Sequence, residues 1–220
     1  MHDLRAERVR ANLEAVRGEI AKAARKAGRD PEAVELLAAC KYVPLEELPA
    51  LAQAGVLHLG ENRAQELVRK ASAPGSERFS WDFIGALQSK HIRAIVPHVR
   101  LIHSLASESA LHELARVADR ARPGMRVLIE VNVAGDGSKG GIAAEELSDY
   151  LASSPFPVAG LMTMPPLTDD PLQSRPYFRA LRELAERHGL GELSMGTSQD
   201  FAVAVEEGAT IVRIGTRLYE

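Results

Sequence analysis

The sequence lacks the features that mark disulfide-rich, membrane-spanning and nucleic-acid-binding proteins. Its one cysteine, Cys40, can form no internal disulfide bond and no zinc cluster, in agreement with a reducing compartment. No apolar run exceeds five residues, whereas a membrane span needs about 20. The net charge is −3, so the basic excess that nucleic-acid binding requires is absent. Residues 1–10 are too charged for a secretory signal, and we expect a cytoplasmic protein without nucleic-acid or membrane partners.

The apolar residues that are present make up 45% of the chain, enough for a globular core. They form eight short runs of the kind found in strands covered on both faces. Strands are predicted at residues 36–40, 56–59, 81–84, 99–104, 126–133, 158–164, 192–195 and 210–214. Helices are predicted between them at residues 44–54, 63–71, 88–96, 108–121, 143–153, 176–188 and 199–207.

The regular alternation of strand and helix requires right-handed crossovers and a parallel sheet. Eight units in 220 residues approach the usual barrel length of about 250 residues. They favour a single-domain α/β fold over residues 1–220, a (β/α)8 TIM barrel, rather than an open doubly wound sheet. No helix is predicted after the eighth strand. An extra amphipathic helix at residues 3–27 could cover that flank instead.

The candidate site residues follow the apolar runs, because the active site of such a barrel lies at the carboxyl ends of its strands. Ser198 follows the seventh run, where a helix is expected to begin, and Gly215 follows the eighth. Hydroxyl and backbone N–H groups at this place often bind phosphate. An equally good interpretation is that Ser198 only caps its helix and Gly215 only makes a turn.

Lys41 directly follows the first apolar run, which brings its amine to the rim or the mouth of the barrel. A partly desolvated amine loses its proton more readily, and the neutral amine attacks carbonyl groups to give a Schiff base. By position alone, a solvated lysine at a strand end is the commoner case. A ligand with an aldehyde at one end and a phosphate at the other would use both Lys41 and the phosphate site.

A series of motifs runs in order along nearly the whole chain. They are residues 36–41 with 44, 58–62 with 65–66, 81–85 with 87–88, 132–142 with 138–139, 160–162 with 164–165, 193–196 with 198 and 200, and 207–210 leading to 212–216. Together they resemble the pyridoxal phosphate homeostasis proteins, which are barrels similar to the amino-terminal domain of alanine racemase. The resemblance implies that barrel type, known as fold type III, and pyridoxal 5'-phosphate (PLP) as the cofactor.

The resemblance also implies roles for individual residues. Lys41 resembles the lysine that holds PLP as a Schiff base, and Arg213 resembles the arginine that donates to the pyridine nitrogen. A fixed guanidinium there would keep the nitrogen unprotonated and make the ring a weaker electron sink. Asn62 resembles a polar contact to the cofactor, although it could instead cap a helix. The implied phosphate ligands are Ser198, Gly215 and Thr216.

Some positions depart from the family pattern. Asp82 stands where the family usually has histidine, and residues 90–91 replace an asparagine-lysine pair, which puts the surface or regulatory roles of that region in doubt. Residues 197–200 replace a methionine-serine-aspartate-aspartate motif but keep Ser198. The implied set of cofactor ligands is therefore complete.

The resemblance implies a carrier function, because the sequence shows no counterpart of a catalytic residue that racemases of this fold use. Racemases of this fold take a catalytic tyrosine from a second domain of a partner subunit, and no motif places a tyrosine of this sequence in that role. We therefore expect a non-catalytic monomer that buffers PLP and delivers it to apo-enzymes. The alternatives are a weak PLP-dependent amino-acid racemase, a Schiff-base enzyme acting on a sugar phosphate, and an interaction protein that docks through its first helix.

Two further features carry weaker signals. The histidines lack the spacing of a metal site, so no metal is expected. Residues 135–141 are rich in glycine but lack the full phosphate-loop pattern, and they are predicted to form a loop after the fifth strand. The histidines considered are His58, His98, His103 and His112.

Overall fold

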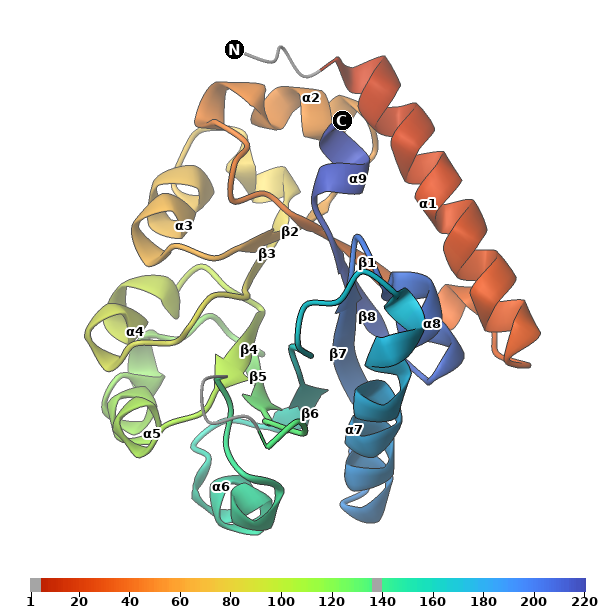
Figure 1. Ribbon diagram of the computed structural model, residues 1–220. Coiled ribbons are helices and arrows are strands. Elements are labelled where there is room, and N and C mark those ends of the chain that lie inside the picture. Colours follow the sequence, from red (N-terminus) through yellow and green to blue (C-terminus); the bar gives the residue numbers. More distant parts are fainter. Residues whose placement is uncertain (1–4, 136–139) are drawn as a thin grey trace.

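The computed structural model describes residues 5–135 and 140–220, and its parallel strands close into a barrel in the order β1 to β8. The strands lie at the centre of the molecule and the helices surround them (Figure 1). The strands are β1 (Glu35–Ala39), β2 (His58–Glu61), β3 (Ser80–Phe83), β4 (Leu101–Leu105), β5 (Arg126–Glu130), β6 (Val158–Met162), β7 (Glu192–Thr197) and β8 (Ile211–Ile214). The predicted (β/α)8 barrel is confirmed, and the open sheet is wrong.

The helices follow the predicted order, most of them with shorter bounds, and the helix predicted at residues 176–188 is shifted by one residue. They are α1 (Ala6–Lys26), α2 (Leu48–Gln53), α3 (Ala64–Ala71), α4 (Ser89–Ile95), α5 (Glu108–Arg116), α6 (Leu147–Ser153), α7 (Arg175–Arg187), α8 (Phe201–Glu206) and α9 (Thr216–Tyr219). The prediction that no helix follows the eighth strand is wrong, because α9 forms a single turn there. Part of the predicted loop at residues 135–141, with its motif at 138–139, lies outside the described residues, as does the start of the predicted helix 3–27.

The interior of the barrel is filled by side chains that alternate along the strands with those facing the helices. The inward apolar residues form a cluster separate from the larger core between strands and helices. Its buried members are Leu37, Leu101, Leu128, Met162 and Ile211. Because side chains alternate with a period of two, the next inward positions on β5 and β8 are Glu130 and Arg213, near the carboxyl ends of these strands.

The first helix, α1, packs along α8 and α9 on the outside of the barrel (Figure 1). Its amide side chain Asn12 donates to the Leu218 carbonyl at 3.2 Å. The predicted cover of this flank is therefore confirmed. The buried residues of the helix are Val9, Leu13, Val16, Ile20, Ala23 and Ala24. Since this apolar face is already packed, it is not available for docking a partner.

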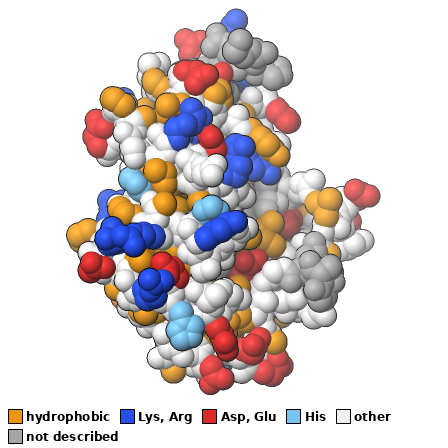
Figure 2. Space-filling model, turned by 90° about the vertical axis from the view of Figure 1, so that its left-hand side faces the viewer, with side chains coloured by type: hydrophobic (Ala, Val, Ile, Leu, Met, Phe, Trp, Pro, Cys, Tyr) orange, Lys and Arg blue, Asp and Glu red, His pale blue; other side chains and the backbone are white. Residues whose placement is uncertain are grey.

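The surface carries charges of both signs. Figure 2 shows one face on which basic and acidic side chains are mixed, with hydrophobic side chains scattered between them. Such mixing matches the small net charge of −3. Among the described residues, no helix combines the length and the apolar character that crossing a membrane requires.

Candidate functional site

A cavity of about 490 Å³ lies at the carboxyl ends of β1 and β8. Its walls bring together Lys41, which follows β1, and Gly215 and Thr216, which follow β8. The strand register explains this meeting, because β1 pairs in parallel with β8 so that Leu37 lies beside Arg213. Half of the predicted ligands therefore line one cavity, and the other half lie on neighbouring segments.

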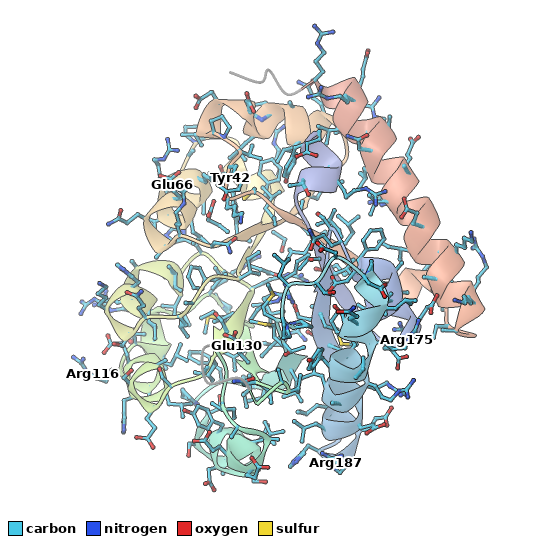
Figure 3. All side chains as sticks on the ribbon, viewed as in Figure 1. Tyr42, Glu66, Arg116, Glu130, Arg175 and Arg187 are labelled. Carbon is cyan, nitrogen blue, oxygen red and sulfur yellow. The ribbon has the colours of Figure 1, made fainter. Side chains whose placement is uncertain are left out.

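Lys41 occupies the second position of a tight turn after β1. The Val43 amide closes this turn by donating to the Cys40 carbonyl at 3.0 Å. The Lys41 ammonium lies 4.6 Å from the centre of the Tyr42 ring, a cation–π distance. Tyr42 itself is 80% exposed, and its position near α2 and α3 is visible in Figure 3. The lysine is thus half-buried at the cavity wall, at the predicted rim of the barrel.

The segment after β7, which carries the candidate phosphate ligand Ser198, differs from the prediction in one respect. Helix α8 begins at Phe201, so Ser198 lies in a turn before the helix and does not cap it. Asp200 shapes this turn by accepting the Thr197 amide at 2.7 Å. Ser198 Oγ accepts the Gly215 amide at 3.1 Å, which joins the segments after β7 and β8. The Gly215 amide is thus paired with Ser198, and the Ser198 hydroxyl can still donate its own hydrogen to an anion.

Arg213 points into the barrel from β8 and is only 6% exposed. Its guanidinium donates to Ser194 Oγ at 2.6 Å and to the Thr163 carbonyl at 3.1 Å. Burial lowers the pKa of Arg213 to about 10, against the opposing charges of Asp200 and Glu130. The guanidinium therefore remains a fixed cation at neutral pH.

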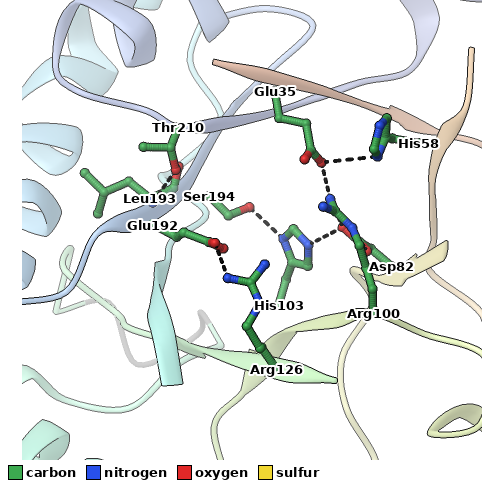
Figure 4. Close-up of polar contacts among 10 residues, drawn as sticks. All are labelled: Glu35, His58, Asp82, Arg100, His103, Arg126, Glu192, Leu193, Ser194 and Thr210. Atoms are coloured by element: carbon green, nitrogen blue, oxygen red, sulfur yellow. Dashed lines mark hydrogen bonds and ion pairs between the residues drawn. The ribbon is translucent and has the colours of Figure 1, made fainter. Parts of the chain in front are cut away.

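From Ser194, the acceptor of Arg213, a chain of polar contacts continues toward the opposite end of the barrel (Figure 4). His103 Nδ1 lies 2.8 Å from Ser194 Oγ, and His103 Nε2 lies 3.0 Å from Asp82 Oδ2. Arg100 Nε donates to Asp82 Oδ1 at 2.8 Å, and Arg100 also pairs with Glu35. The Asp82 carboxylate only accepts, so we assign the proton of a neutral imidazole to Nε2 and let Ser194 donate to Nδ1.

This network changes the interpretation of Asp82. Its departure from the family pattern bears on no surface role, because Asp82 is completely buried inside the barrel. It supplies the negative charge that holds Arg100 and orients His103. Its effect on the site is therefore exerted through Ser194 and Arg213.

The buried His103 predicts that the protein loses stability in mild acid. Burial lowers the pKa of His103, although the hydrogen bond to Asp82 acts to raise it. The histidine therefore takes up a proton more readily in the unfolded chain than in the folded protein. The neutral, buried His103 therefore contributes its full share to the free energy of unfolding above the unfolded pKa of about 6.5. As the pH falls below this value, the free energy of unfolding declines by up to about 1.4 kcal/mol per pH unit. Urea unfolding from pH 7 to pH 5 should show a shallower slope for His103→Gln than for the wild type. The exposed His112→Gln is the control, and equal slopes for all three proteins would contradict the prediction.

Asn62 follows β2 and carries an unsatisfied acceptor. Its Oδ1 is buried and accepts no hydrogen bond from any residue in the described ranges. The alternative interpretation as a helix cap is wrong, because Arg63 is the N-cap residue of α3 and the cap has no side-chain hydrogen bond. A buried polar atom without a protein partner leaves a hydrogen bond for a group outside the protein, such as an ordered water or a ligand. With the Lys41 amine and the Arg213 cation, it fits the polar groups of PLP.

Sequence reasoning missed three charged residues at this end of the barrel. Glu130 lies near the middle of the ring of helices in Figure 3, and burial raises the pKa of its carboxyl group, with Arg213 opposing. Glu61 and Lys70 form a buried ion pair at 2.6 Å. Glu61 and Glu130 could have been recognised as candidate site residues, because each is a charged residue at the end of an apolar run.

Comparisons with known sequences agree on one family. A model of the alanine racemase N-terminal domain matches residues 9–220. The pyridoxal phosphate homeostasis protein of Aquifex aeolicus is 43% identical over 210 residues, covering 91% of this chain and 92% of the relative. The protein of the same name from Pseudomonas aeruginosa is 36% identical over 214 residues, covering 94% and 93%.

Solved structures lead to the same assignment. The structure of PipY from Synechococcus elongatus with PLP bound has a TM-score of 0.80 and 29% identity, and the match covers 96% of this chain and 100% of PipY. Alanine racemase from Bartonella henselae has a TM-score of 0.70 at 15% identity, covering 98% of this chain and 59% of the racemase, and shows the fold alone. The chain therefore belongs to the pyridoxal phosphate homeostasis proteins, within the family of the alanine racemase N-terminal domain.

Proposed function

We propose that this protein is a non-catalytic PLP carrier, a single barrel domain over residues 1–220 that acts as a monomer in the cytoplasm. It buffers the reactive aldehyde and passes the cofactor to apo-enzymes. The observation that carries the proposal is the cavity whose wall joins Lys41 to Gly215 and Thr216. The relatives named as PLP homeostasis proteins and the PLP-bound PipY structure support it.

The implied ligands would bind different parts of PLP. Lys41 would hold PLP through its side-chain amine, which can condense with the aldehyde of the cofactor with loss of water. Ser198 and Thr216 would bind the phosphate group, and Asn62 would contact the cofactor near β2. Arg213 would donate to the ring nitrogen. The phosphate ligands and Lys41 would thus bind opposite ends of the PLP molecule.

The fixed charge of Arg213 favours storage over catalysis. When bound, PLP supplies an aldehyde for covalent capture and a ring that can withdraw electrons. A permanent guanidinium cation facing the ring nitrogen disfavours protonation of that nitrogen, which weakens electron withdrawal. Since burial leaves the pKa of Arg213 at about 10, the guanidinium keeps its charge at neutral pH. This electronic setting suits binding without turnover.

One observation favours a second candidate function, a weak amino-acid racemase. Glu130 is an acid near the mouth of the barrel, and burial raises the pKa of its carboxyl group toward the range useful for proton transfer. It would serve together with Lys41 as one of two proton-transfer groups. Steady racemisation of an amino acid that is lost in both Lys41→Ala and Glu130→Gln would favour this function over the carrier.

Covalent capture at Lys41 is the test of the proposed function. On mixing with PLP, the wild-type protein should develop a visible absorption band, and borohydride reduction should fix the adduct on the peptide containing Lys41. Lys41→Ala should lose the band, because Lys41 is the one lysine among the described residues that line this cavity. Lys26→Ala is the control, since Lys26 is an exposed lysine on α1. Adducts spread over surface lysines, or an unchanged band in Lys41→Ala, would refute the assignment.

A further inference from the structure

A fully buried ion pair lies directly behind the turn that carries Lys41. Lys70 of α3 and Glu61 at the end of β2 have side chains that are 1% and 0% exposed, and Lys70 Nζ lies 2.6 Å from Glu61 Oε2. Taking two charges out of water is costly, and their attraction offsets this cost only where further hydrogen bonds satisfy both groups. The groups that complete the hydrogen bonding therefore indicate what the pair holds in place.

Lys70 holds the backbone at the first residue of the Lys41 turn. Its ammonium donates to the Cys40 carbonyl at 2.8 Å, the same oxygen that accepts the Val43 amide. That carbonyl belongs to the first residue of the turn, so a single cation anchors the bond that closes it. Arg63 adds a second tie by donating from Nη2 to the Lys41 carbonyl at 2.5 Å. The backbone that carries the candidate lysine is therefore held at two successive carbonyl groups.

Glu61 extends the same arrangement to a second candidate ligand. Its Oε1 accepts the Asn62 amide at 2.8 Å and the Arg63 amide at 3.0 Å, while its Oε2 faces Lys70. The carboxylate thus has partners on both oxygens. It connects the segment after β2, which carries Asn62, to the segment after β1, which carries Lys41.

We propose that Lys70, with Glu61 as its counter-charge, is a positioning residue that keeps the Lys41 turn in the geometry needed to capture PLP. We call this pair the Glu61–Lys70 clamp, and its role rests on the proposed function. Without the clamp, the turn keeps its own closing bond, the bond from the Cys40 amide to the Gly60 carbonyl at 2.9 Å and the tie from Arg63, but the Cys40 carbonyl loses its cation. The Lys41 amine would then sample more positions, and addition to the aldehyde with loss of water would slow down.

Three variants test the clamp. Lys70→Met removes the cation but leaves Glu61 charged and buried, so that protein can fail to fold. The double variant Glu61→Gln with Lys70→Met removes both charges at similar volume and keeps an acceptor for the Asn62 amide. Lys26→Met is the matched control, because it breaks an exposed pair with Glu206. Two quantities are measured, namely the rate of adduct formation at Lys41 with PLP and amide hydrogen exchange of residues 40–43 without cofactor.

If the clamp positions the turn, the double variant Glu61→Gln with Lys70→Met should unfold near the wild-type temperature. It should form the Lys41 adduct about tenfold more slowly than the wild type. The Val43 amide should exchange faster in the same protein, because the carbonyl to which it donates has lost its anchor. Lys26→Met should match the wild type in both measurements. Wild-type reaction and exchange in a folded double variant would overturn the inference. If the wild type itself forms no adduct at Lys41, the proposed function fails, while the exchange data still decide whether the clamp holds the turn.

Discussion

Gly85→Ala is expected to destabilise the protein by about 3 kcal/mol, the upper range for overpacking a tight site. A Cβ at Gly85 would lie 1.9 Å from the Asn62 carbonyl oxygen and 2.7 Å from its carbonyl carbon. Both atoms are backbone, so no change of rotamer relieves the overlap. Gly85 follows β3 and Asn62 follows β2, and the collision would force these strand ends apart at the site. We expect a lower urea midpoint together with weaker PLP binding.

Gly18→Ala provides a control with the same chemical change. Gly18 lies inside α1, and an added Cβ there meets no other atom within 4 Å. Alanine in a helix interior is favoured over glycine by about 0.5–1 kcal/mol, so this variant should be at least as stable as the wild type. A Gly85→Ala protein that unfolds at the wild-type midpoint would show that β2 and β3 do not approach this closely.

Asp82→Asn is expected to cost about 3–5 kcal/mol, the range measured when one partner of a buried ion pair is removed. The carboxylate is completely buried and accepts from Arg100 and from His103. An amide at this position keeps the shape but turns one acceptor into a donor that faces other donors. The His103 ring would lose its orientation, and the hydrogen bonds that lead through Ser194 to Arg213 would weaken.

A carboxylate in a surface ion pair gives the comparison for Asp82. Glu113 pairs with Arg116 within α5 at 2.7 Å, and the Arg116 side chain is 74% exposed. Exposed pairs of this type contribute about 1 kcal/mol or less, so Glu113→Gln should unfold close to the wild type. Equal urea midpoints for Asp82→Asn and Glu113→Gln would mean that the network inside the barrel adds no stability.

The sequence alone was sufficient to predict the barrel and the position of Lys41. Apolar runs such as residues 36–40 form strands because a parallel sheet is covered on both faces, and that local pattern can be read without tertiary contacts. The position of Lys41 is predicted because it is the residue directly after such a run. The ordered motifs then led to the family, which the comparisons confirm.

Local patterns were less informative where one turn decides the outcome. The start of α8 was placed too early, because Asp200 accepts the Thr197 amide and forms a turn that delays the helix to Phe201. Helix α9 was missed because its one turn contains a single buried residue, Leu218, which is too little for a helical period to be visible.

Only the tertiary structure decided which polar residues meet. His103 contacts Ser194 across 91 sequence positions and Asp82 across 21, and each of these residues lies on a strand beside at least one apolar residue. Lys70 sits on a short helix where a charged residue normally faces water, yet it is buried against Glu61 and the Cys40 carbonyl. Local sequence patterns determine which strands and helices form, because they reflect which face of each element is buried. The partners of buried charges depend on how the barrel closes, since closure brings distant strand ends to one edge.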